Sequence, residues 1–116
     1  MRSRNLRAAP GIAYNDRMTL NERQKKYLRR IGHALHPIVT LGNAGLTDAV
    51  VAEMDRALTD HELVKVKARV GEREARDLAL TALTTRTTST LVQRIGNVAL
   101  LFRPNTKGMS RIVIPD

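Results

Sequence analysis

The spacing of apolar residues predicts that the chain opens with an amphipathic helix over about residues 19–34. Apolar side chains recur there three or four positions apart, so that they share one face of a helix. Thr19 and Glu22 have the spacing of a capping box, in which each side chain accepts from the other residue's backbone amide. Pro37 ends the helix, because a residue that precedes proline is driven out of the helical conformation.

The pattern further along predicts two more helices and four strands. We expect strands at 38–41, 62–68, 91–95 and 98–103, and helices at 47–59 and 72–85. Gly96-Asn97 joins the last two strands as a type II′ hairpin. Residues 112–114 are a candidate for a short edge strand. The apolar positions that we expect the third helix to bury are Ala75, Leu78, Ala79 and Ala82.

Composition predicts where the third helix ends and where the N-terminal segment gives way to the folded domain. The run from Thr84 to Thr90 is rich in β-branched residues, which lowers helix propensity and should end that helix. Residues 1–17 mix arginine with small and turn-forming residues without periodicity, which predicts a disordered basic arm. The domain then spans residues 18–116, and Met18 is an alternative start that the sequence leaves open.

The order of the elements, α-β-α-β-α-β-β, predicts an α/β fold with a mixed four-stranded sheet. Strands separated by helices imply parallel crossovers, whereas the closing hairpin adds an antiparallel strand.

Charge is the strongest signal in the composition. The net charge is +9 and the isoelectric point is about 11.1, which favours a polyanionic partner such as nucleic acid or an acidic membrane surface. The chain has no cysteine, which excludes disulfides and thiolate chemistry. No apolar run approaches a membrane span, and the N-terminal arginines precede no signal-peptide core. We therefore expect a cytoplasmic protein without a membrane partner.

The first helix carries cations on the face opposite its apolar residues, where only Glu22 opposes them. A face that is merely solvated usually mixes both signs, so that this face favours contact with RNA phosphate. The cations are Arg23, Lys25, Lys26, Arg29 and Arg30, with His33 beside them.

Two further features have a functional and a structural interpretation. Gly42-Asn43-Ala44-Gly45 joins a strand to a helix, and its free amides suit a phosphate, although a tight turn needs the same residues. No Gly-Lys-Ser/Thr follows, so that it is not a nucleotide-binding P-loop. Lys65 and Lys67 share one face of a strand, where they bind an anion or only keep the sheet soluble.

The sequence offers no constellation for catalysis or for a metal ion. The only histidines, His33, His36 and His61, lack the pattern of a metal or acid–base site. The carboxylates of the helical segments fit surface or cap positions: Asp55, Glu62, Glu72, Glu74 and Asp77. We expect a protein that is not an enzyme and needs no cofactor or metal.

Three stretches in register resemble the CRM (chloroplast RNA splicing and ribosome maturation) domain family. They read IVTLGNAGLT over residues 38–47, HELVKVK over 61–67 and VQRIGNVALLFRP over 92–104. A stand-alone copy is similar to the bacterial YhbY-like proteins. The resemblance implies a two-layer α/β sandwich similar to the C-terminal domain of translation initiation factor three. It also implies RNA binding and association with precursors of the large ribosomal subunit.

The family's GxxG loop carries over to Gly42, Asn43, Ala44 and Gly45, and its strand lysines to Lys65 and Lys67. We expect a monomeric, non-catalytic module with no small-molecule substrate, in which the first helix captures rRNA and the loop clamps a backbone segment, as in KH domains. Base stacking should matter little, because aromatics are scarce and Tyr27 and Phe102 are expected in the core. A protein-interaction adaptor that docks on a ribosomal protein or an assembly GTPase is the alternative.

Overall fold

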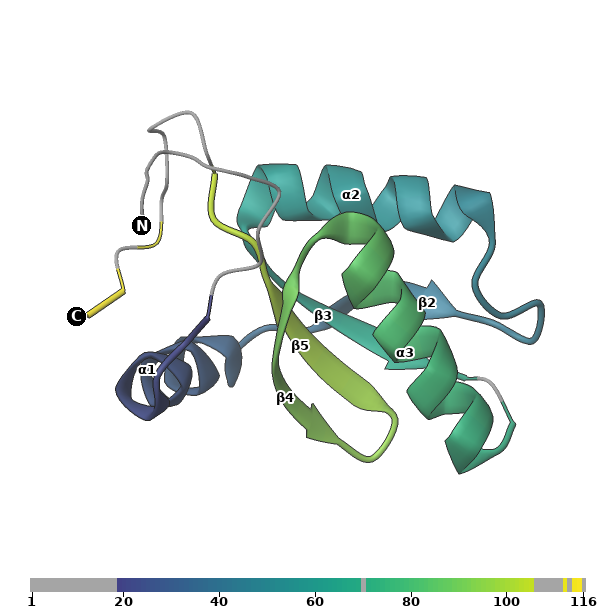
Figure 1. Cartoon of the computed structure of the whole chain (residues 1–116), viewed down its shortest axis with the longest axis horizontal. Coiled ribbons are helices and arrows are strands. Elements are labelled where there is room, and N and C mark those ends of the chain that lie inside the picture. The colour runs from purple at the N-terminus through teal and green to yellow at the C-terminus, as the bar shows by residue number, and fades with distance from the viewer. Residues whose placement is uncertain (1–18, 70, 106–111, 113, 116) are drawn as a thin grey trace.

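A mixed four-stranded sheet organises the computed structural model of this protein, which describes residues 19–69, 71–105, 112 and 114–115 (Figure 1). Along the chain the elements are α1 (Glu22–Gly32), β2 (Pro37–Leu41), α2 (Asp48–His61), β3 (Leu63–Ala68), α3 (Arg73–Thr87), β4 (Thr90–Ile95) and β5 (Val98–Phe102). This order and the mixed sheet confirm the predicted α/β fold with a mixed four-stranded sheet.

The strands lie side by side in the order β2-β3-β5-β4. The α2 crossover makes β2 and β3 parallel, with Thr40 opposite Lys67. β5 runs antiparallel to both β3 and β4. Gly96 has a φ of 58°, the conformation that the first turn position of the predicted type II′ hairpin requires. β2 and β4 are therefore the edge strands, and β3 lies inside the sheet.

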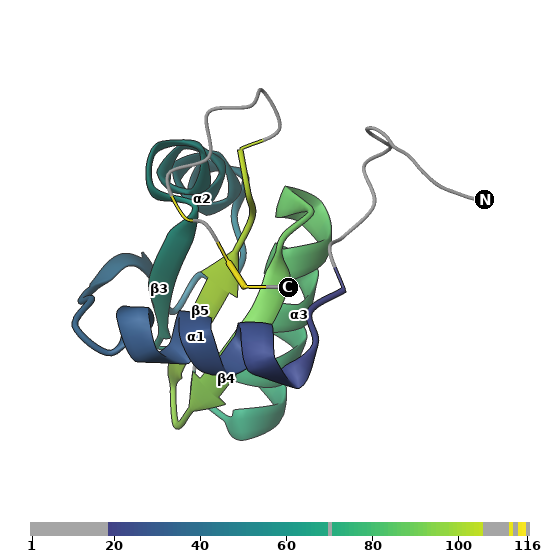
Figure 2. The same cartoon turned by 90° about the vertical axis from the view of Figure 1, so that its left-hand side faces the viewer.

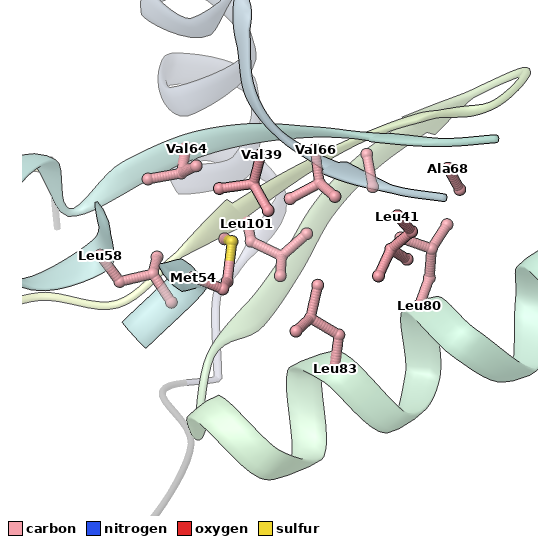
Figure 3. Packing of buried hydrophobic residues seen from close by; sticks show 11 residues of the cluster. Val39, Leu41, Met54, Leu58, Val64, Val66, Ala68, Leu80, Leu83 and Leu101 are labelled. Atoms are coloured by element: carbon pink, nitrogen blue, oxygen red, sulfur yellow. The ribbon is translucent and has the colours of Figure 1, made fainter. Parts of the chain in front are cut away.

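α2 and α3 cover one face of the sheet, where the main core lies (Figure 3). Alternation along β3 sends Val64 and Val66 into this core and leaves Lys65 and Lys67 on the other face, as predicted. The buried residues of the main core are Val39, Leu41, Met54, Leu58, Val64, Val66, Ala68, Leu80, Leu83, Ala99 and Leu101.

α1 covers part of the opposite face and closes a second apolar cluster (Figure 2). Leu28 is fully buried there, and the buried residues of the cluster are Leu20, Leu28, Leu63, Val92, Leu100 and Phe102. Gly32 lets the helix approach β5 closely, because a β-carbon at this position would lie 2.6 Å from a methyl carbon of Leu100. The burial of Phe102 and the partial burial of Tyr27 agree with the core positions expected for them.

The capping box of α1 is displaced by two residues from the predicted one, which was wrong. Asn21 is the cap: its side chain accepts from the Gln24 amide at 2.8 Å, and the Gln24 side chain accepts from the Asn21 amide at 3.0 Å. Both Thr19-x-x-Glu22 and Asn21-x-x-Gln24 satisfy the motif. Beginning the helix after Asn21 leaves Leu20 outside the helix, where it is buried in the second cluster.

α3 differs from its prediction in its end and in its buried face. It continues to Thr87, so that the β-branched residues do not end it, and their hydroxyls are satisfied within the helix, with Thr87 bonded to the Leu83 oxygen at 2.7 Å. Leu78 was expected in the core but is 73% exposed, and Leu80 and Leu83 are buried instead. Leu80 and Leu83 are three residues apart and share the helix face that packs against the sheet, whereas Leu78 points away from it.

The segment after β5 does not form the edge strand proposed for residues 112–114, as far as its described residues show. Ile112 and Ile114 lie outside the strands and pack against the second cluster. The Ile112 amide donates to the Glu62 carboxylate at 3.1 Å and not to a neighbouring strand. The predicted arm over residues 1–17 lies outside the described residues.

Candidate nucleic-acid interface

The exposed side of α1 presents the cations that the sequence placed there. Arg23, Lys26 and Arg30 are exposed at spacings of three and four residues, which aligns them along one side of the helix. Lys25 and Arg29 are half-buried beside them. Lys25 lies 3.8 Å from Glu22, and the Arg30 guanidinium lies 5.4 Å from the centre of the Tyr27 ring. The result is a row of largely unneutralised positive charges.

The two strand lysines lie on the same sheet face as α1 but have different surroundings. The Lys65 Nζ donates to the Leu35 carbonyl at 3.0 Å, just beyond the C-terminal end of α1, where the helix dipole favours a cation. Lys67 lies between Thr40 of β2 and Val98 of β5. Within the part of the chain that the structure covers, Lys67 makes no hydrogen bond or ion pair, so it is the more available of the two for an anion.

The Gly42–Gly45 loop forms a tight turn directly after β2. The Gly45 amide donates to the Gly42 carbonyl at 2.9 Å and closes the turn. The amides of Asn43 and Ala44 have no hydrogen-bond partner among the described residues, and both residues are exposed. These two amides are therefore the donors that the turn offers to an anion.

The two glycines of this turn have different structural roles. Gly45 has a φ of 74°, which other residues rarely adopt, so the turn itself requires glycine there. Gly42 lies outside the left-handed region, and a β-carbon added to it would meet nothing within 4 Å. The fold therefore gives no reason for glycine at Gly42, whereas close approach of an external backbone would.

The N-terminus of α2 is capped and carries a carboxylate. Thr47 accepts from the Val50 amide at 3.2 Å, and Asp48 pairs with Arg86 at 3.0 Å. An incoming phosphate would meet the Asp48 carboxylate there. The exposed amides of Asn43 and Ala44 are therefore better placed to attract an anion than the N-terminus of α2 is.

The predicted site residues lie in two places joined by the lysines of β3 (Figure 1). α1 lies near one end of the molecule and the Gly42–Gly45 turn lies at the other, beyond the end of β2. Lys65 contacts the residues that follow α1, while Lys67 pairs with Thr40, which is close to the turn. A ligand that touches both places must be extended along this sheet face.

Three arginines outside α1 and β3 form contacts that hold the fold together. Arg86 pairs with Asp48 and Arg94 with Asp77. Arg103 contacts the Asp55 carboxylate at 2.6 Å and donates to the Thr87 carbonyl at 2.9 Å, which ties the end of β5 to α2 and α3. Arg103 belongs to the third stretch that resembles the CRM family, and its role here is structural.

Glu62 is a buried residue that sequence reasoning placed only at a cap or surface position. It is 1% exposed, follows α2 with a φ of 67°, and accepts from the backbone amides of Asn105 and Ile112. These partners are 43 and 50 residues away along the chain, so no local pattern in the sequence could have revealed them.

Other kinds of site find little support in the described part of the molecule. It contains no group of three or more histidine, aspartate or glutamate side chains arranged to hold a metal ion. None of the helices seen in the structure has the length and apolar character that a bilayer span requires.

Comparison with known proteins places this geometry in a family. Residues 20–103 match the model of the CRS1/YhbY (CRM) domain. A "Probable RNA-binding protein" of Pseudomonas aeruginosa is 47% identical over 90 residues, which cover 78% of this chain and 86% of that protein. An "RNA-binding protein" of Haemophilus influenzae is 40% identical over 97 residues, covering 84% and 96% respectively.

A solved structure agrees with these sequence matches. The solution structure of a hypothetical protein from Staphylococcus aureus, described as a candidate RNA-binding protein, superimposes with a TM-score of 0.71 at 30% identity. It covers 84% of this chain and all of the other chain. Together with the Gly42–Gly45 turn, the β3 lysines and the closing hairpin, these matches show that the chain belongs to the CRS1/YhbY (CRM) domain family.

Proposed function

We propose that this protein binds folded RNA without a chemical step and acts as an assembly factor on precursors of the large ribosomal subunit. We propose further that it works in the cytoplasm as a monomer. The names of the bacterial relatives, which describe RNA-binding proteins, support the RNA-binding part of this proposal.

The observation that carries the proposal is the uneven distribution of charge between the two sides of the sheet. The cationic face consists of Arg23, Lys25, Lys26, Arg29, Arg30, Lys65 and Lys67. Glu22 is the only carboxylate that forms an ion pair with any of them in the described structure. On the other side, α2 carries Asp48, Glu53, Asp55 and Asp60 against a single arginine, Arg56, and the three arginines of α3 are nearly balanced by its two carboxylates. A polyanion is therefore attracted to the α1 side.

The geometry favours recognition of a phosphate backbone over recognition of base sequence. The side chains of Arg23, Lys26 and Arg30 project from a rigid helix and can follow successive phosphates. Lys67 continues the positive charge across the sheet towards the Gly42–Gly45 turn. Phosphate contacts position an RNA and supply affinity, and shape decides which folded RNA fits.

Salt titration of RNA binding tests this function. Each phosphate contact should contribute about 0.7–0.9 to the slope of log affinity against log salt concentration. The double substitution of Arg23→Gln and Lys26→Gln should weaken binding to a structured rRNA fragment and reduce that slope by roughly 1.4–1.8. The matched control combines Arg56→Gln and Arg73→Gln in one protein, which removes the same amount of charge from α2 and α3.

The outcomes separate the alternatives. Equal losses of RNA affinity in the two double variants would mean that net charge alone attracts the RNA. Binding that is insensitive to salt would contradict phosphate recognition and favour the protein-interaction adaptor, whose partner should remain bound at high salt. The ribosomal part of the proposal is tested by sedimentation of cell extracts, in which the protein should migrate with precursors of the large subunit and leave them after the Arg23 and Lys26 substitutions.

A further inference from the structure

An apolar groove lies where the C-terminal end of α1 meets the beginnings of β2 and β3. It has a volume of about 440 Å³, and its apolar walls include the side chains of Ile31, Leu35, Ile38, Leu63 and Ile112. Leu35 and Ile38 are 37% and 50% exposed, so that the groove presents aliphatic surface to solvent. The volume falls within the range of small-molecule binding sites.

Among the described residues, the rim of the groove carries nitrogen groups and no carboxylate. His36, His61 and Lys65 are the ionisable residues of this part of the chain that line it. The Lys65 Nζ uses one hydrogen on the Leu35 carbonyl and retains two for another acceptor. Both histidines are exposed. The groove therefore combines an apolar floor with a rim that attracts an anion.

The groove shares a residue with the cationic face. Lys65 belongs to that face and also lines the groove, where its Nζ lies beside the Leu35 carbonyl just beyond α1. A phosphate bound at Lys65 would bring the adjoining nucleotide to the mouth of the groove. This shared lysine is what suggests an occupant.

We propose that the groove takes one unpaired nucleobase of the RNA bound along α1. This inference rests on the proposed function and deepens it. The aliphatic walls would cover the faces of the base, the exposed imidazoles of His36 and His61 can stack on it, and Lys65 would reach its phosphate or a base acceptor.

The charge on the rim distinguishes a nucleotide from an apolar peptide segment or a second copy of the chain. An apolar segment would place aliphatic groups against the Lys65 ammonium, whereas a nucleotide brings its own anion next to an apolar surface. The protein would then prefer RNA that offers an unpaired base. Base contact was not expected from the sequence, because these walls are aliphatic and not aromatic.

Nuclear magnetic resonance spectra of the full-length protein test the occupant, with the backbone amides of Arg23 and Lys26 reporting on α1 and the methyl groups of Leu35 and Ile38 reporting on the groove. One RNA is a stem with an unpaired loop, and the other is the same stem continued as a duplex. Both should shift the amide signals of α1, but only the looped RNA should shift the methyl groups of Leu35 and Ile38. Groove signals that do not move with the looped RNA, while α1 signals do, would overturn the inference and leave the proposed function intact.

Two other results have distinct meanings. If neither RNA moves the α1 signals, the proposed function fails together with the inference. If the groove signals move when the protein is concentrated without RNA, a second copy occupies the groove and the nucleobase is the wrong occupant.

A pair of matched variants gives a second test. The double variant with Leu35→Ala and Ile38→Ala should reduce the ratio of the affinity for looped RNA to the affinity for duplex RNA by about tenfold. This is the scale expected when one bound base loses its contacts. The control, Leu78→Ala with Leu91→Ala, shortens two exposed aliphatic residues elsewhere and should leave the ratio unchanged. Because both affinities are measured on the same preparation, partial unfolding cancels from the ratio. An unchanged ratio in the groove variant would overturn the inference.

Discussion

At the scale of single residues, two glycines of one turn have different physical requirements. Gly45 needs its missing side chain because its φ is 74°, whereas Gly42 has an ordinary φ and open space around it. Replacing glycine where the native conformation suits alanine stabilises a protein by about 0.4–1 kcal/mol, mainly through the unfolded chain. Comparing the two positions therefore separates the needs of the fold from those of a ligand.

We predict that Gly42→Ala keeps or slightly raises the melting temperature and weakens RNA binding, because the new methyl group obstructs an approaching backbone. Gly45→Ala should lower the free energy of unfolding by about 1–2 kcal/mol, the cost of a left-handed conformation in alanine. Thermal unfolding and RNA titration of both variants measure these effects. If Gly42→Ala binds RNA as well as the parent, the turn does not contact RNA through this glycine.

At the scale of elements, Glu62 connects the end of α2 to the segment that follows β5. Its carboxylate accepts hydrogen bonds from the backbone amides of Asn105 and Ile112, and its carbonyl accepts one from the Arg103 amide at 2.9 Å. A buried carboxylate that accepts backbone amides holds distant segments in one geometry, and a lost acceptor leaves a buried amide unsatisfied. This residue therefore stabilises the region that packs against the second cluster.

Glu62→Gln is predicted to lower the free energy of unfolding by about 1–3 kcal/mol, because one acceptor oxygen is replaced by an NH₂ donor that faces a backbone amide. Urea unfolding measures the change. Glu53→Gln, an exposed position of α2, is the control and should change stability by no more than about 0.5 kcal/mol. Equal stabilities of the two variants would show that the Glu62 hydrogen bonds add nothing to stability.

At the scale of the whole molecule, the basic residues divide into those that hold the fold and those that remain open to a ligand. Arg86, Arg94 and Arg103 pair with carboxylates of α2 and α3. The cations of α1 and Lys67 face the other side of the sheet, where one carboxylate, Glu22, pairs with one of them in the described structure. Net charge alone does not make this distinction.

Replacing one member of each group should give opposite results. Arg103→Ala removes hydrogen bonds to the Asp55 and Thr87 carbonyls and is predicted to cost about 1–3 kcal/mol of stability, with unchanged RNA affinity per folded molecule. Lys67→Ala should leave stability within about 0.5 kcal/mol and weaken RNA binding. The measurements are chemical unfolding and RNA titration. A loss of affinity in the folded Arg103 variant would place that arginine in the interface.

The sequence by itself determined the elements, their order and the general position of the charged face. Periodicity assigns apolar residues to a helix or strand through short-range geometry, which explains why the seven elements and the alternation of Val64, Lys65, Val66 and Lys67 were predicted. The resemblance to the CRM family was carried by local stretches of sequence, and the family match confirms it.

Only the tertiary structure decided which of several equivalent local patterns is used and which polar groups meet. Packing against the sheet buried Leu80 and Leu83 and not Leu78, and the burial of Leu20 accompanied a cap at Asn21 and not at Thr19. The Lys65 contact with Leu35 spans 30 residues and the Glu62 contact with Ile112 spans 50. Such partners, and the groove between α1, β2 and β3, arise from chain segments that meet only after folding, so that no local pattern in the sequence encodes them.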